Sequence, residues 1–103
     1  MTLNSKDWKA TESTDFGGGN RHLTVIGMVE VTATNMEPVI RPAIPQGTNP
    51  KILLLSVSER PEGDMGGQVM TWKPAEYTQP VSEGQYSEVT VDGQTVKVQE
   101  LIS

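Results

Sequence analysis

Residues 87–98, SEVTVDGQTVKV, decide the fold class of this chain because they have the pattern of a tight β-hairpin. Two segments in which apolar and polar side chains alternate, residues 87–91 and 94–98, flank Asp92-Gly93. A two-residue Asp-Gly loop suits a hairpin turn of this kind, because both of its residues need a positive φ. With this loop Val89 is expected opposite Val96, so that all the valines share one face. The hairpin is therefore predicted to belong to a sheet with one buried side.

Two further strands are predicted before this hairpin. Residues 22–32 alternate between apolar and polar, and Gly27 in their middle indicates a bulge or a close backbone approach. In residues 51–60 the consecutive apolar side chains 52–55 would make both faces of the strand apolar, which fits a central strand. We expect Leu53, Leu55 and Val57 to point inward.

Prolines shape the prediction for the remaining segments. Residues 36–44 contain Pro38 and Pro42, which favour an edge strand or an extended connection. Residues 68–73 are predicted as a strand that Pro74 interrupts, with a possible extension through Tyr77 and Thr78. Trp72 in this strand is expected in the core, and a surface patch with Tyr77 for a carbohydrate or peptide is the weaker alternative.

The spacing of these segments predicts an all-β fold. Six or seven short strands with turns every eight to twelve residues favour a two-sheet antiparallel sandwich of immunoglobulin-like type. A small β-barrel is the alternative. Residues 1–20 are predicted to be a flexible polar N-terminal tail and residues 21–103 the sandwich domain. In a sharper alternative, Trp8 folds back onto the sandwich.

Composition excludes several classes of function. The chain has 103 residues, no cysteine and a net charge of −5, with its basic residues scattered singly, which argues against a nucleic-acid partner. No apolar run approaches the roughly 20 residues of a membrane span, so no membrane partner is expected. The start of the chain lacks the pattern of a signal peptide, and a soluble cytoplasmic protein is the default expectation.

No catalytic, cofactor or metal site can be composed from the sequence. His22 is the single histidine, and a metal site needs three or four ligands. The acidic residues suggest no pair suited to acid–base chemistry. The glycine runs at 17–19 and 66–67 precede strands, whereas a phosphate-binding loop precedes a helix. We therefore predict a protein that is not an enzyme and needs no cofactor.

Two surfaces are candidates for contact with a partner. Ile26 and Met28 are on the outward register of one predicted strand, and Ile52 and Leu54 on that of another. If these strands are neighbours, the four side chains form an apolar outer face that the tail, another protein or a second copy of the chain would cover. The alternatives are a wrong register or a deeper core. The second candidate is an exposed, mobile loop that contains the residues Arg60, Glu62, Asp64 and Met65.

The sequence leaves the function unknown and favours one class over two others. A non-enzymatic interaction or structural module is the first hypothesis, because the chain offers a complete scaffold without a catalytic site. A small peptidase inhibitor that presents the loop before Gly66-Gly67 is the alternative. An enzyme is the least favoured class.

Overall fold

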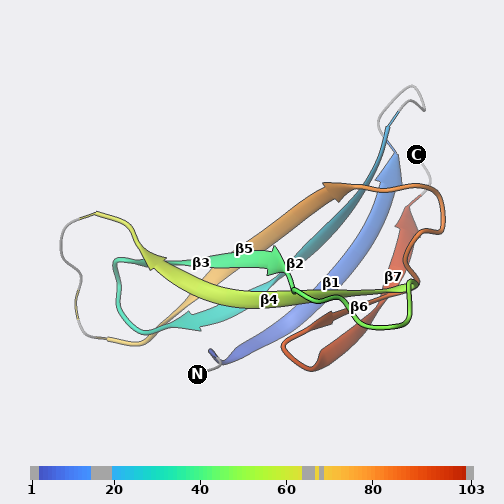
Figure 1. The fold of residues 1–103 in the computed structure, drawn as a ribbon. Coiled ribbons are helices and arrows are strands. Elements are labelled where there is room, and N and C mark those ends of the chain that lie inside the picture. The colour runs from blue at the N-terminus through green and yellow to red at the C-terminus, as the bar shows by residue number, and fades with distance from the viewer. Residues whose placement is uncertain (1–2, 15–19, 64–66, 68, 102–103) are drawn as a thin grey trace.

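The structure is a computed structural model that describes residues 3–14, 20–63, 67 and 69–101. Within these ranges the chain is all-β, as predicted (Figure 1). The strands are β1 (Ser5–Thr14), β2 (Arg21–Val31), β3 (Met36–Pro42), β4 (Ile52–Pro61), β5 (Thr71–Pro80), β6 (Glu88–Val91) and β7 (Gln94–Leu101).

The strands form a single mixed sheet that is nearly closed into a barrel. Their order is β3-β4-β6-β7-β1-β2-β5, with parallel pairs at β4–β6 and β1–β7 and antiparallel pairs elsewhere. The predicted two-sheet antiparallel, immunoglobulin-like sandwich is therefore wrong. The physical reason lies in β7, which pairs with β6 up to Lys97 and with β1 from Val98 onward, so that one strand carries the sheet around the bend. The alternative, a small barrel, is nearer to the observed fold.

The edge strands β3 and β5 face each other across the seam of this barrel (Figure 1). Lys73 of β5 points inward and donates to the Thr34 carbonyl at 2.8 Å, and its Nζ lies 3.0 Å from a carboxylate oxygen of Glu37. These side-chain contacts bridge the seam at the point where no backbone ladder joins the two strands in the described residues.

Prolines block the open edge of β3. The Ala43 N–H donates to the Leu54 carbonyl of β4 at 2.9 Å, and such bonds recur at every second residue of an antiparallel ladder. Pro38 and Pro42 therefore occupy positions whose nitrogen faces away from β4. The prediction of a proline-bearing edge strand is confirmed.

The open edge of β5 is blocked in the same way. The Val81 N–H donates to the Arg21 carbonyl at 3.0 Å. In an antiparallel ladder every second N–H faces the neighbouring strand, so the odd-numbered residues of β5 direct their N–H groups at β2 and the even-numbered ones direct theirs outward. Pro74 and Pro80 again fall on the positions that face outward from the sheet. Pro74 thus does not interrupt the strand, contrary to the prediction, because a proline at such a position removes no ladder bond. Both edges are poor templates for another strand.

Residues 5–14, which were predicted to be part of a flexible tail, form β1 between β2 and β7. The tail assignment is wrong for these residues, whereas the glycine run at 17–19 lies outside the described residues. The pattern was hidden because the inward positions carry small or polar side chains: Ala10 and Glu12 are both buried. The proposal that Trp8 packs onto the domain is confirmed, since only 8% of its surface is exposed.

A β-bulge turns Trp8 toward the core. Lys6 pairs with Met28 and Lys9 with Ile26, so Asp7 and Trp8 together oppose the single residue Gly27. Asp7 has a φ of 59°, the left-handed conformation that begins one class of bulge. The Trp8 ring lies directly on Gly27, since a Cβ there would be 2.3 Å from Trp8 Cε3. The predicted close backbone approach at Gly27 is confirmed, whereas the bulge lies opposite it, in β1.

The predicted final hairpin and its register are both confirmed. Val89 pairs with Val96, and the turn has φ values of 47° at Asp92 and 83° at Gly93. Leu53 and Leu55 are buried and Val57 packs at the margin of the core, as expected. Trp72 is an exception, because it points outward and is 37% exposed. The buried core consists of Trp8, Ala10, Leu23, Val25, Val29, Val31, Ile40, Leu53, Leu55, Ala75, Val89 and Val91.

We expect Gly27→Ala to lower the free energy of unfolding by about 3 kcal/mol, the upper part of the range for overpacked cores. The added methyl group would overlap the buried Trp8 ring, which cannot move without opening the core. Urea denaturation followed by tryptophan fluorescence measures the change. Gly47→Ala is the control, because its Cβ would meet only the flexible end of Leu54 at 3.3 Å. Equal stability of the two variants would contradict the assigned contact.

Candidate functional site

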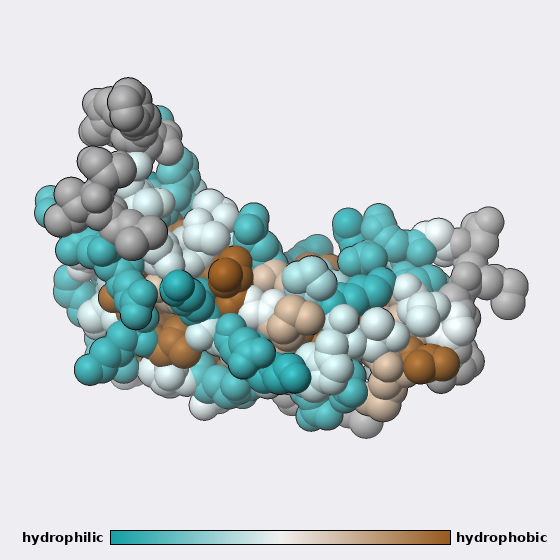
Figure 2. Space-filling view, turned by 180° about the vertical axis from the view of Figure 1, so that it is seen from behind, coloured by the Kyte–Doolittle hydropathy of each residue, from teal (hydrophilic) through white to brown (hydrophobic). Residues whose placement is uncertain are grey.

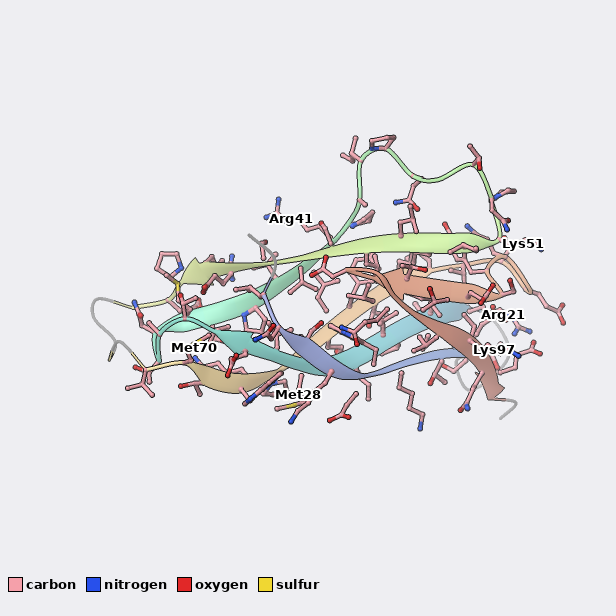
Figure 3. All side chains as sticks on the ribbon, turned by 90° about the horizontal axis from the view of Figure 1, so that it is seen from below. Arg21, Met28, Arg41, Lys51, Met70 and Lys97 are labelled. Atoms are coloured by element: carbon pink, nitrogen blue, oxygen red, sulfur yellow. The ribbon has the colours of Figure 1, made fainter. Side chains whose placement is uncertain are left out.

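The four apolar residues predicted to share one outer face lie on two different sides of the barrel. β2 lies between β1 and β5, whereas β4 lies between β3 and β6. Figure 3 shows Met28 on the lower outer side and β4 on the upper side. The premise that the two strands are neighbours does not hold, so Ile26 and Met28 must be considered apart from Ile52 and Leu54.

Leu54 and Ile52 are half-buried, and the chain's own loop covers part of their surroundings. The Gln46 side chain donates to the Leu54 carbonyl at 2.8 Å and accepts from the Leu54 N–H at 2.9 Å. It thereby continues the ladder of β4 after β3 has ended, while Gly47 packs against the end of the Leu54 side chain. Residues 46–47 of the same chain therefore cover part of this side of β4, without a partner protein.

Ile26 and Met28 belong to a more open surface on β1, β2 and β5. Ile26 is 44% exposed and pairs with Glu76 of β5. Further along the sheet Pro74 pairs with Met28, and Trp72 pairs with Glu30. A hollow of about 520 Å³ is formed by Asp7, Gly27, Ala75 and Glu76 together with Ile26, Met28 and Pro74. Figure 2 views the molecule from this side, where apolar patches lie within a mainly hydrophilic surface. We call the outward side chains Lys6, Lys9, Ile26, Met28, Trp72, Pro74 and Glu76 the β2 face.

A cation–π contact orders one margin of the β2 face. Lys6 Nζ lies 4.4 Å from the centroid of the Trp72 ring, although the two residues come from β1 and β5. The contact links β1 to β5 across β2 and leaves the indole 37% exposed. Sequence reasoning missed Trp72 here. Side chains at every second position of a strand point to the same face. Trp72 is therefore expected on the outer face with Pro74 and Glu76 once the strand is continued through the proline.

A cluster of charges lies at one end of the barrel. Glu12 is 2% exposed, and its carboxylate accepts a hydrogen bond from Arg21 Nη1 at 2.6 Å. The same guanidinium lies 3.1 Å from Glu100 and 3.8 Å from Glu83. Desolvation lowers the pKa of Arg21, but the hydrogen bond and charge of Glu12, aided by the other two carboxylates, outweigh it and raise the pKa above its ordinary value. The cluster pairs the buried Glu12 carboxylate with a guanidinium.

Asp92 is a second polar group with an unusual environment. Its Oδ2 atom is buried and accepts no hydrogen bond from the described residues. Burial raises the pKa of Asp92 above the ordinary value, although a hydrogen bond from the Val57 backbone opposes the shift. The residue lies in the hairpin turn beside the middle of β4, where its N–H donates to the Leu55 carbonyl at 3.4 Å.

The predicted contact loop is only partly within the described residues. Arg60 ends the regular part of β4, and its guanidinium lies 3.9 Å from Glu62, with both side chains exposed. Asp64 and Met65 lie outside the described residues, as does Gly66 of the predicted inhibitor loop. Gly67 is tied to the turn after β2, because its N–H donates to Thr34 Oγ1 at 2.7 Å.

Other candidates for chemistry have structural roles. The Glu59 carboxylate accepts from the Thr32 hydroxyl at 2.6 Å and so joins β4 to β2. His22 is half-buried on β2 and has a partner. Within residues 3–14, 20–63, 67 and 69–101 there is no group of three or more His, Cys, Asp or Glu side chains that could hold a metal ion.

The same ranges contain no helix with the length and apolarity needed to cross a membrane.

Comparison with known proteins does not assign the chain to a family. No family model matches it, and neither a curated protein nor a solved structure shows significant similarity to it. The site must therefore be argued from its own residues.

We expect Asp92→Asn to stabilise the protein at pH 7 by up to about 1 kcal/mol, because the carboxylate is only partly buried. The pKa of Asp92 is higher in the folded state, so ionisation disfavours the fold, and the wild type loses stability as pH rises from the ordinary Asp value through the raised one. Asparagine keeps a suitable Asn-Gly turn and carries no charge.

Urea titrations at several pH values test this expectation. The difference between Asp92→Asn and the wild type should vanish below about pH 3.9, where the carboxyl group is neutral in both states. Asp7→Asn is the control, since Asp7 is exposed and also has a positive φ of 59°. A stability difference that is the same at all pH values would show that burial of the charge is not its cause.

Proposed function

We propose that this protein is a non-enzymatic interaction module that binds a protein partner through the β2 face. The observation that carries the proposal is the row of outward apolar side chains that runs from Ile26, 44% exposed, past Met28 and Pro74 to Trp72, 37% exposed at the margin. Apolar groups that gather on the surface of a regular sheet are typical of contact sites. An indole beside aliphatic side chains is also the composition in which binding energy concentrates.

The edges of the sheet support contact through its face. A partner strand could add to β3 or β5 only by bonding to outward-facing backbone groups. Pro38 and Pro42 on β3, and Pro74 and Pro80 on β5, remove donors at those positions. Side-chain contact with the face remains the mode that the strand chemistry favours.

The charge arrangement supports a binding role over a catalytic one. The buried Glu12 carboxylate accepts a hydrogen bond from Arg21 at 2.6 Å. The Glu59 carboxylate accepts one from the Thr32 hydroxyl at 2.6 Å. The hollow of the β2 face is lined by two exposed acids, Asp7 and Glu76, but its described lining has no hydroxyl, imidazole or amine that could act with them in nucleophilic or acid–base catalysis.

Site-specific photo-cross-linking in the cell of origin tests the proposal. A photoreactive amino acid at Ile26 is expected to give a discrete adduct, whereas one at Ser56, which is exposed on β4 across the barrel, gives none. Trp72→Ala in addition should reduce the adduct at least tenfold, because loss of an indole from a contact site costs about 2 kcal/mol or more of binding energy. The absence of an adduct at Ile26, or equal adducts at both positions, would refute the proposal.

A further inference from the structure

The β2 face carries a row of side chains that is complementary to itself. Lys9 of β1 pairs with Ile26 of β2, and Ile26 pairs with Glu76 of β5, so the three lie side by side across the sheet. The row runs from a basic through an apolar to an acidic side chain. All three residues are exposed.

The two charges of this row have no counterpart among the described residues. Neither Lys9 nor Glu76 forms an ion pair with the residues that the structure describes, whereas Lys73 and Arg21 do. β2 separates them, so their backbones are about 10 Å apart, two strand spacings. Their ammonium and carboxylate groups remain available to a partner that presents the opposite order of charge.

A second copy of the chain presents that order. When two identical faces are related by a two-fold axis parallel to β2, the β1 of one copy lies over the β5 of the other. Lys9 then meets the partner's Glu76, Glu76 meets the partner's Lys9, and the two Ile26 side chains meet at the axis. A two-fold axis across the strands would place like charges together, so charge selects the first arrangement.

We propose that a second copy of this chain docks on the β2 face about a two-fold axis parallel to β2, with Lys9 of each copy paired to Glu76 of the other. This inference rests on the proposed function, because it names the partner of the same surface. Twisted sheets that pack face to face touch mainly at their centre, where the Lys9–Ile26–Glu76 row lies. Three strands make a small interface, so the dimer is weak and dissociates on dilution.

Sedimentation equilibrium of the full chain tests the proposal at low salt, from about 10 μM to about 1 mM, the range suited to a small interface. The wild type is expected to associate reversibly to a dimer. Lys9→Glu and Glu76→Lys should each weaken the dimer at least tenfold, because each places like charges together at two points. Arg41→Glu makes the charge change of Lys9→Glu at an exposed position of β3, on the side of the barrel opposite Met28 (Figure 3), and should leave the dimer intact.

Mixing the two variants gives the decisive result. A 1:1 mixture of Lys9→Glu and Glu76→Lys should form a heterodimer, because the opposed charges are again of opposite sign. Failure of the mixture to associate, or a wild type that stays monomeric at all concentrations, overturns the proposal. If the wild type is monomeric while cross-linking at Ile26 captures a different protein, the proposed function stands and self-pairing fails. If both experiments are negative, both proposals fail.

Discussion

The contact of the Trp8 indole with the backbone of Gly27 is the constraint on which the barrel depends. It requires a residue without a Cβ on β2 and a bulge at Asp7 on β1 that turns the indole inward. The buried ring then fixes β1 against β2. Because β1 also pairs with β7, this contact keeps the wall continuous where two separate sheets would otherwise form. The Trp8 N–H, which donates to Ser5 Oγ at 3.0 Å, is satisfied by the same strand.

The parts of this fold that could be predicted from sequence are those set by neighbouring residues. The register of the last hairpin follows from the Asp92-Gly93 turn and its valines, and the structure reproduces it. The choice between sandwich and barrel depends on the parallel pairs β4–β6 and β1–β7, whose partners are far apart in the chain. No local periodicity encodes such pairings. β1 itself escaped detection because its inward positions include Ala10 and Glu12, and the bulge shifts its alternation.

The candidate site was predicted in part for the same reason. The outward register of Ile26 and Met28 follows from local alternation, and it agrees with the structure. The supposed link to Ile52 and Leu54 assumed a strand pairing that the fold does not make. The expectation that Trp72 lies in the core is wrong: it rests on the usual burial of large aromatic side chains, whereas Trp72 is 37% exposed. Its outward position follows once β5 is continued through Pro74, whose nitrogen faces the open edge of the sheet.

The bulge connects the core to the proposed interface. In a regular strand, residues 6 and 9 would point to opposite faces, because side chains alternate strictly. The extra residue at Asp7–Trp8 brings Lys6 and Lys9 to the same outer face, beside Met28 and Ile26 respectively. The insertion that turns an indole into the core therefore also creates the basic side of the β2 face. A chain without the bulge would lose the charge order across β1, β2 and β5 together with its central core contact, so the stability of the fold and the complementarity of the surface have one structural origin.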